Sequence, residues 1–178
     1  LYDMLKINSE GGFFMKKTDE LTMAMIEYFG GDAKRIQHFI KVHAFSRLIG
    51  ESEGLDEKTL YILETASIVH DIGIKAAEEK YGYQNGKLQE ELGPEIAQKM
   101  LEKLGFEEDV IERVCFLVSK HHTYSGVEEK MDYRILLEAD FLVNFYEFGL
   151  EKRSIYAAKD VIMKTETGRK MCRLMFLE

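Results

Sequence analysis

The chain has 178 residues, 46% of them apolar and 31% charged, so it can bury a substantial core without disulfides or a structural metal. Its formal net charge of −8 disfavours binding to a nucleic-acid polymer, whereas a small phosphorylated ligand stays compatible because a bound cation reverses the local charge. No apolar run approaches the ~18 residues that a membrane span needs, and nothing resembles a secretory signal. We therefore expect a cytoplasmic protein that binds neither a membrane nor a nucleic-acid polymer.

The N-terminal segment differs in character from the rest of the chain. Residues 1–14 contain glycines and lack helical periodicity, and Met15 looks like a natural start. We expect residues 1–14 to be a leader or a remnant of cloning. Residues 15–178 contain no linker, internal repeat or low-complexity tract, so we expect them to form a single domain.

Helical spacing of apolar residues dominates this domain, and strand alternation is nearly absent. Asp32 and Asp56 are placed to cap two helices, which Gly50 and Gly73 would end. Pro94 suits the first turn of a later helix, where a missing N–H costs little. The helices are expected at residues 18–29, 32–49, 56–71, 94–105, 107–121, 132–147, 153–165 and 167–177, with a short helix and a loop within 75–92.

This series of about seven to nine helices with short connections predicts an all-α helical bundle. The final helices, over 153–177, would either cover the core or form a homodimer contact. Substrate specificity would depend on the loops within 76–93 and 123–131, where three tyrosines are candidates to stack on a base. These are Tyr81, Tyr83 and Tyr124.

Four titratable side chains interrupt the apolar faces of the predicted helices. His38 begins a stripe of apolar residues spaced by four, three and four, so it faces inward. His70 continues the apolar face of the next helix, and Asp71 follows it directly. Asp140 lies on the apolar face of the helix expected at 132–147. These four side chains are therefore expected to point toward one core.

A divalent metal ion explains this convergence. A carboxylate on an apolar stripe is costly unless it is paired or binds a metal. Neutral imidazoles and two ionised aspartates are suitable ligands, and a donor set without thiolates suits Mn, Fe, Co, Ni, Mg or Zn. Each residue alone has an ordinary alternative: a hydrogen-bonded core histidine, a polar helix end or, for Asp140, an ion pair with Arg134.

Three segments, in this order along the chain, resemble the HD-domain superfamily of metal-dependent phosphohydrolases. SIVHDIGIK (67–75) looks like the His-Asp doublet of that family. HFIKV (38–42) resembles its upstream helix, and LLEADFL (136–142) its distal helix. The likeness extends over about residues 32–148. It implies an all-α bundle with a central metal, whose ligands would be His38, His70, Asp71 and Asp140.

The resemblance also implies an activity. A metal-activated water would hydrolyse a phosphoester or phosphoanhydride of a small molecule, which we expect to be a nucleotide. Asp71 would be both a ligand and the group that orients or deprotonates the water. Lys75, His121 and His122 are the further candidate catalytic residues, because they could offset charge on the transferring phosphoryl group.

One position departs from the relatives that bind two metals. The stretch LGPEI resembles one of their second-metal segments, but Leu92 stands where a histidine would be expected. Glu91 or Glu95 are possible substitutes. We therefore expect one tightly held ion, with His122, and less surely His121, facing the substrate phosphate or a weak second ion. A solvated helix end is the alternative for both histidines.

Two other functions stay open at this point. Some relatives use a mixed-valent di-iron centre to oxidise their substrates, which requires the extra histidines and is disfavoured by Leu92. A degenerate or metal-bearing module could instead only sense a ligand or partner. The intact set of four ligands disfavours degeneracy but is compatible with sensing.

Overall fold

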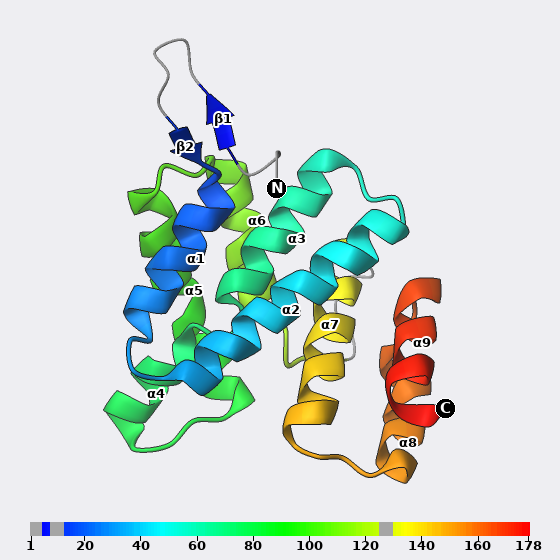
Figure 1. The fold of residues 1–178 in the computed structure, drawn as a ribbon. Coiled ribbons are helices and arrows are strands. Elements are labelled where there is room, and N and C mark those ends of the chain that lie inside the picture. The colour runs from blue at the N-terminus through cyan, green and yellow to red at the C-terminus, as the bar shows by residue number, and fades with distance from the viewer. Residues whose placement is uncertain (1–4, 8–12, 125–129) are drawn as a thin grey trace.

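The computed structural model describes residues 5–7, 13–124 and 130–178, and it is a bundle of helices (Figure 1). The predicted all-α class is confirmed. In chain order, the elements are β1 (Leu5–Ile7), β2 (Phe13–Met15), α1 (Lys17–Tyr28), α2 (Ala33–Ser52), α3 (Glu57–Val69), α4 (Gly73–Tyr81), α5 (Gly86–Lys103), α6 (Glu108–Val118), α7 (Met131–Glu147), α8 (Lys152–Ile162), α9 (Glu166–Cys172) and a π-helical turn (Arg173–Leu177).

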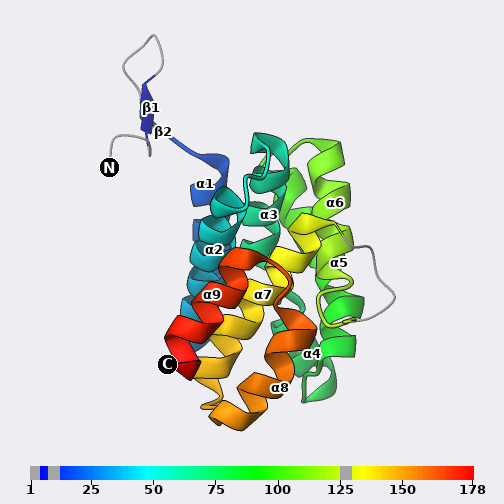
Figure 2. The same cartoon turned by 90° about the vertical axis from the view of Figure 1, so that its right-hand side faces the viewer.

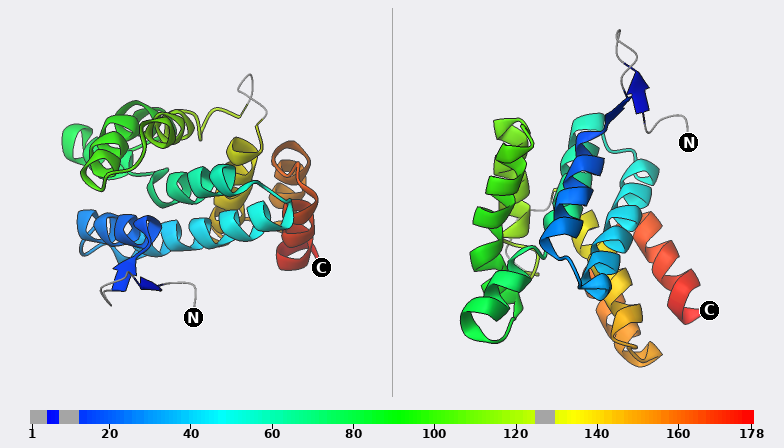
Figure 3. Two further views of the ribbon diagram at one scale, coloured as in Figure 1. Left: turned by 90° about the horizontal axis from the view of Figure 1, so that it is seen from above. Right: turned by 60° about the vertical axis from the view of Figure 1, so that its left-hand side comes forward.

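Helix α2 forms the centre of the bundle, because it packs against both α3 and α7. Helix α3 also contacts α6, and the pair α5 and α6 forms one side of the molecule (Figure 3). Helices α8 and α9 pack on α7 at the other side (Figure 2). The fully buried apolar side chains come from most of these helices and include Leu21, Phe39, Ile49, Leu63, Leu101, Leu117 and Leu136.

Two of the predicted helix starts are confirmed by their side-chain caps. The carboxylate of Asp32 accepts a hydrogen bond from the backbone N–H of Arg35 at 3.0 Å. The carboxylate of Asp56 accepts from the N–H groups of Lys58 and Thr59. Such caps satisfy backbone donors that have no partner inside the helix, so they fix where each helix begins.

The two glycines expected to end helices do something else. Gly50 lies inside α2, where an added Cβ would come 2.8 Å from a methyl group of Leu60 on α3. Gly73 starts α4, and a Cβ there would come 2.8 Å from both the carbonyl oxygen of Gln89 and the amide nitrogen of Gly93. Both glycines therefore allow a close approach between helices. Their predicted role as helix ends was wrong.

The position of Pro94 also differs from the prediction. Pro94 lies in the middle of α5, which begins eight residues earlier at Gly86. The side chain of Asn85 caps this start by accepting from the N–H of Leu88 at 3.0 Å. The loop expected up to residue 92 is therefore shorter, and α5 extends toward the end of α4.

The segment ahead of α1 contains a feature that the sequence pattern did not indicate. Strands β1 and β2 pair antiparallel, with Leu5 opposite Met15, and they lie outside the bundle (Figure 2). Residues 1–4 and 8–12 of the predicted leader lie outside the described residues. Over the ranges that are described, no helix has the length and apolar character that crossing a membrane requires.

The last helices are attached to α7 through buried contacts. Ile155, Met163 and Cys172 are buried in the common core. The carboxylate of Glu138 on α7 accepts hydrogen bonds from the backbone N–H groups of Lys164 and Thr165, the latter at 2.7 Å. Of the two roles expected for residues 153–177, covering the core is therefore the one that the structure supports.

Candidate metal centre

Nitrogen and oxygen atoms from four side chains converge inside the bundle. Nε2 of His38 lies 3.3 Å from Nε2 of His70 and 3.2 Å from Oδ1 of Asp140. Oδ2 of Asp71 lies 3.8 Å from Nε2 of each of these histidines. Nε2 of His70 lies 3.7 Å from Oδ1 of Asp140. Ligand atoms of His38, His70 and Asp71 are close enough to one another to share one cation, and Oδ1 of Asp140 lies beside both histidines.

The packing of α2 on α3 and α7 brings the four residues together. His38 is on α2, His70 and Asp71 follow α3, and Asp140 is on α7. The side chain of His70 is fully buried, and those of His38 and Asp140 are nearly so. This is the arrangement that the apolar stripes of the three helices predict.

The second ring nitrogen of each histidine is held by an acceptor. Nδ1 of His38 lies 3.0 Å from Oε2 of Glu147, and Nδ1 of His70 lies 2.9 Å from the carbonyl oxygen of Ser67. Carboxylate and carbonyl oxygens only accept, so each Nδ1 carries a hydrogen and donates it. In a neutral ring, Nε2 then presents a lone pair to the cluster.

This arrangement fits a divalent ion better than it fits the four side chains alone. Two lone pairs and two carboxylates that face one another repel unless a cation or a proton lies between them. An ion in this place would have both aspartates to balance its charge, and the Nδ1 hydrogen bonds would orient both imidazoles toward it. His38, His70 and Asp71 form one of the groups whose ligand atoms lie close enough to bind one ion together.

The electrostatics of the cluster favour ionised carboxylates. Burial raises the pKa of Asp140, but hydrogen bonds from His38 and His70 outweigh it and hold the pKa well below its usual range. Burial likewise raises the pKa of Asp71, whereas the charge of His70 and hydrogen bonds from two further histidines lower it strongly. Both aspartates are therefore anionic near neutral pH.

The same charges act in the opposite direction on His38. Burial lowers its pKa, but the hydrogen bond and charge of Asp140, with the charges of Asp71 and Glu147, raise it to about 9. Without a metal ion, a proton on His38 would supply part of the positive charge that the cation otherwise provides. Metal binding must therefore displace this proton.

Asp71 connects this cluster to a second group of residues. Its Oδ1 atom lies 2.8 Å from Nε2 of His121 and 3.6 Å from Nε2 of His122. Nδ1 of His121 lies 2.7 Å from the carbonyl oxygen of Val118 and donates to it. His121 is almost completely buried, so the solvated helix end considered for it is not what the structure shows.

His122 is contacted by Gln89, a residue that the sequence analysis did not identify. Nε2 of His122 and Oε1 of Gln89 form a short contact, and Nδ1 of His122 lies 3.3 Å from the hydroxyl oxygen of Tyr124. Glu91 and Glu95, expected as substitutes for a histidine at position 92, are both exposed. The predicted substitution by either glutamate was therefore wrong, and Gln89 occupies this place.

The sequence does contain a pattern that indicates a buried position for Gln89. The buried residues of α5 are spaced by four and comprise Gln89, Gly93, Ala97 and Leu101. A helix that starts at Pro94 lacks about two turns that the structure contains, and Gln89 lies in those turns. A polar residue that begins an otherwise small or apolar buried stripe is the pattern that also identified His38.

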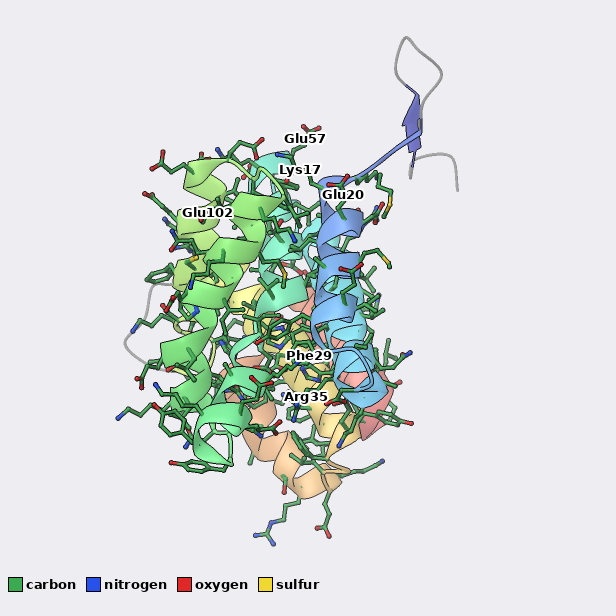
Figure 4. All side chains as sticks on the ribbon, turned by 90° about the vertical axis from the view of Figure 1, so that its left-hand side faces the viewer. Lys17, Glu20, Phe29, Arg35, Glu57 and Glu102 are labelled. Atoms are coloured by element: carbon green, nitrogen blue, oxygen red, sulfur yellow. The ribbon has the colours of Figure 1, made fainter. Side chains whose placement is uncertain are left out.

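Lys75 lies against Tyr28 and not beside the substrate phosphate, the position that its place after the His-Asp doublet predicts. Its Nζ atom donates to the carbonyl oxygen of Tyr28 at 2.8 Å and lies 5.0 Å from the centre of the Tyr28 ring. Lys75 is not among the described residues that line the cavity over the cluster. The cations that do line it are Lys34 and Arg35, at the start of α2. Figure 4 shows Arg35 at this end of the bundle.

A cavity of about 320 Å³ leads to the cluster. His38 and Asp71 form part of its wall, together with His122, and Phe148 lies at the end of α7. Arg35 is paired with Glu78 through two hydrogen bonds of 2.6 and 2.9 Å. A larger cavity of about 680 Å³ lies between α1 and α5 and contains none of the predicted site residues.

Comparisons with known proteins identify relatives of this fold. A family model described as HD domain matches residues 35–158. No curated protein matches the chain. A solved structure described as a predicted HD superfamily hydrolase from an uncultured Thermotogales bacterium is 23% identical. The match covers 87% of this chain and 82% of that chain with a TM-score of 0.64, which shows a shared fold.

Proposed function

Since this chain belongs to the HD domain family, we propose that it is a metal-dependent phosphohydrolase. Its substrate would be a phosphoester or phosphoanhydride of a small molecule, and specifically a nucleotide. The observation that carries the proposal is the cluster of two imidazole nitrogens 3.3 Å apart with two buried carboxylates beside them. Two members of this cluster line a cavity that a substrate can enter.

Four residues would hold the metal: His38, His70, Asp71 and Asp140. The donors are imidazole nitrogens and carboxylate oxygens, which suit Mn, Fe, Co, Ni, Mg or Zn. When bound, such an ion lowers the pKa of a coordinated water and polarises a phosphoryl oxygen. The geometry of the four donors supports one ion at this position.

Asp71 is the best candidate to handle the proton of the attacking water. Its Oδ2 atom faces the metal cluster, and its Oδ1 atom lies 2.8 Å from Nε2 of His121. Because Nδ1 of His121 donates to Val118, its Nε2 atom is the one that shares a proton with Asp71. While Nε2 of His121 carries no proton, a proton taken up from water at Asp71 would pass to it.

The cavity is lined by two cations, Lys34 and Arg35, and by three carboxylates. A bound divalent ion would add the positive charge that favours an anionic substrate, despite the net charge of −8 for the whole chain. His122 lines the cavity, and exchanging its contact with Gln89 or Tyr124 would let its ring donate a hydrogen bond to a phosphoryl oxygen. Lys34 is exposed and has no ion-pair partner among the described residues, so it is available to a phosphate. It would take the role that the sequence analysis gave to Lys75.

Phosphate release tests this proposal. Purified protein loaded with Mn²⁺, Co²⁺ or Ni²⁺ is incubated with a panel of nucleotides and simple phosphate esters. We expect release from at least one member and its loss in Asp71→Ala. The variant Glu64→Gln, a partly buried carboxyl outside the cavity, serves as the control and should keep the activity. The absence of release from every member by metal-loaded wild type contradicts the proposal.

A further inference from the structure

Phe148 is an exposed aromatic residue in the wall of the cavity. Its side chain is 70% exposed, whereas Phe39, which also lines the cavity, is 1% exposed. The neighbouring Phe141 and Phe145 pack on each other with ring centres 5.7 Å apart. Single exposed apolar residues are common on protein surfaces, so exposure alone assigns no role to Phe148. Its position relative to the metal cluster is more informative.

Phe148 belongs to a row of residues that begins at a metal-ligand candidate. Asp140, Asn144 and Phe148 are spaced by four, so the first two share one face of α7 and Phe148, the residue that caps its C-terminus, continues the row. At about 1.5 Å per residue, Phe148 lies roughly 12 Å along the helix from Asp140. Asn144 lies between them, and its side-chain N–H donates to Oδ1 of Asp140 at 2.8 Å. One wall of the cavity therefore runs from a ligand through an amide to an aromatic ring.

The start of α2 contributes charge to another part of the wall. Lys34 precedes His38 by four residues, so the two lie on the same face of α2, one turn apart. Both line the cavity, as does Phe148. Residues of both α2 and α7 line the cavity, so a ligand there would contact both helices. A cation near the phosphate position and an aromatic ring farther out make a site with two chemically different ends.

We propose that Phe148 is a stacking platform for the base of a nucleoside monophosphate. The phosphate would lie at the metal cluster, the sugar beside Asn144 and the base on the ring of Phe148. The inference rests on the proposed function and adds the residue that selects the substrate. The volume of about 320 Å³ supports one nucleotide, because it lies at the lower end of the roughly 300–1,000 Å³ of small-molecule sites.

The other aromatic candidates are placed less suitably. Tyr81 and Tyr83 pack on each other with ring centres 6.4 Å apart, and Tyr124 packs edge-on against Phe141. Phe39 is buried against Phe29 and the ring of His70. Among the described residues that line the cavity, Phe148 is thus the aromatic residue whose ring is open to a ligand.

Two substrates that differ by the base alone test this inference. Hydrolysis of adenosine 5′-monophosphate and of ribose 5-phosphate is measured with metal-loaded wild type and with Phe148→Ala, Phe148→Leu and Phe148→Tyr. Stacking of a base on an aromatic ring contributes to binding free energy. We therefore expect kcat/KM for the nucleotide to fall about tenfold in the alanine variant. Ribose 5-phosphate should change less than about twofold. The tyrosine variant should restore the preference, and the leucine variant should not.

The control is Tyr156→Ala, which removes another exposed aromatic ring that is not among the cavity residues. It should leave both substrates unchanged. Equal effects of Phe148→Ala on the two substrates, or no effect on either, overturn the inference. If wild type hydrolyses neither compound, the proposed function is wrong for these two substrates. Calorimetric measurement of the binding of both compounds then tests the role of Phe148. Tighter binding of the nucleotide that depends on Phe148 supports the inference, whereas equal binding or no binding overturns it.

Discussion

Nδ1 of His38 lies 3.0 Å from Oε2 of Glu147, a residue seven positions after Asp140 on the same helix. The contact orients the imidazole so that its Nε2 atom faces His70 and Asp140. Glu147 also pairs with Lys41, one turn after His38 on α2. The candidate metal site is therefore supported by residues around it that bind no metal themselves.

Replacing Glu147 should weaken metal binding although Glu147 is not a ligand. In Glu147→Ala, the N–H of His38 loses its acceptor and the ring can rotate, so we expect affinity to fall by about 10- to 100-fold. Glu147→Gln keeps an acceptor without the charge and should lose less. Competition with a metal chelator measures both. Unchanged affinity in the alanine variant contradicts this account, and the exposed Glu151→Ala is the control.

Gly86 should be needed to position His122. A Cβ at Gly86 would come 2.6 Å from Cγ of His122, so Gly86→Ala must displace this ring. We expect kcat to fall by about 10- to 100-fold, as displacements of about 1 Å in active sites do, with unchanged binding of the first metal ion. The measurement is steady-state kinetics together with metal content.

A double-mutant cycle isolates this effect. If Gly86 acts through His122, then Gly86→Ala should cost nothing further in a His122→Ala background. Additive losses in the double variant would show that Gly86 affects activity by another route.

Glu138 should make the stability of the protein depend on pH. Burial raises its pKa, and the hydrogen bonds from Thr165 and Lys164 lower it by less. The folded state therefore holds the proton more tightly than the unfolded state does. The resulting stabilisation is fully present below the unfolded pKa and is lost as pH rises through the raised folded pKa.

The variant Glu138→Gln has no such titration and keeps an oxygen to accept the two backbone N–H groups. We expect the free energy of unfolding of wild type, relative to this variant, to decrease as pH rises above about 4.5. Urea unfolding at a series of pH values measures the difference, in which contributions from other groups cancel. A difference that is independent of pH, or that changes in the opposite direction, contradicts the assignment.

Local signals in the sequence predicted much of the fold. Asp32 and Asp56 cap helices through neighbours two or three residues away, so their effect is visible in the sequence alone. The inward stripe that contains His38 depends on helical periodicity, which is also local. The convergence of three such stripes, together with the family resemblance, was enough to predict which four side chains meet.

The remaining errors concern contacts between distant parts of the chain. Gly50 and Gly73 are glycines because other helices approach them closely, and no local pattern reports this. Gln89 and Glu147 join the site through contacts with histidines more than 30 residues away. Lys75 follows the His-Asp doublet in sequence but lies over Tyr28, because the start of α4 directs it toward α1.

The metal content of the purified protein tests the central claim most directly. After incubation with Mn²⁺ or Co²⁺ and removal of the excess, elemental analysis is applied to wild type, Asp140→Asn and the surface control Asp109→Asn, with circular dichroism to verify folding. We predict about one ion per chain in wild type and the control, and little in folded Asp140→Asn. No bound metal in wild type, or equal amounts in folded Asp140→Asn, would contradict a metal centre formed by these four residues.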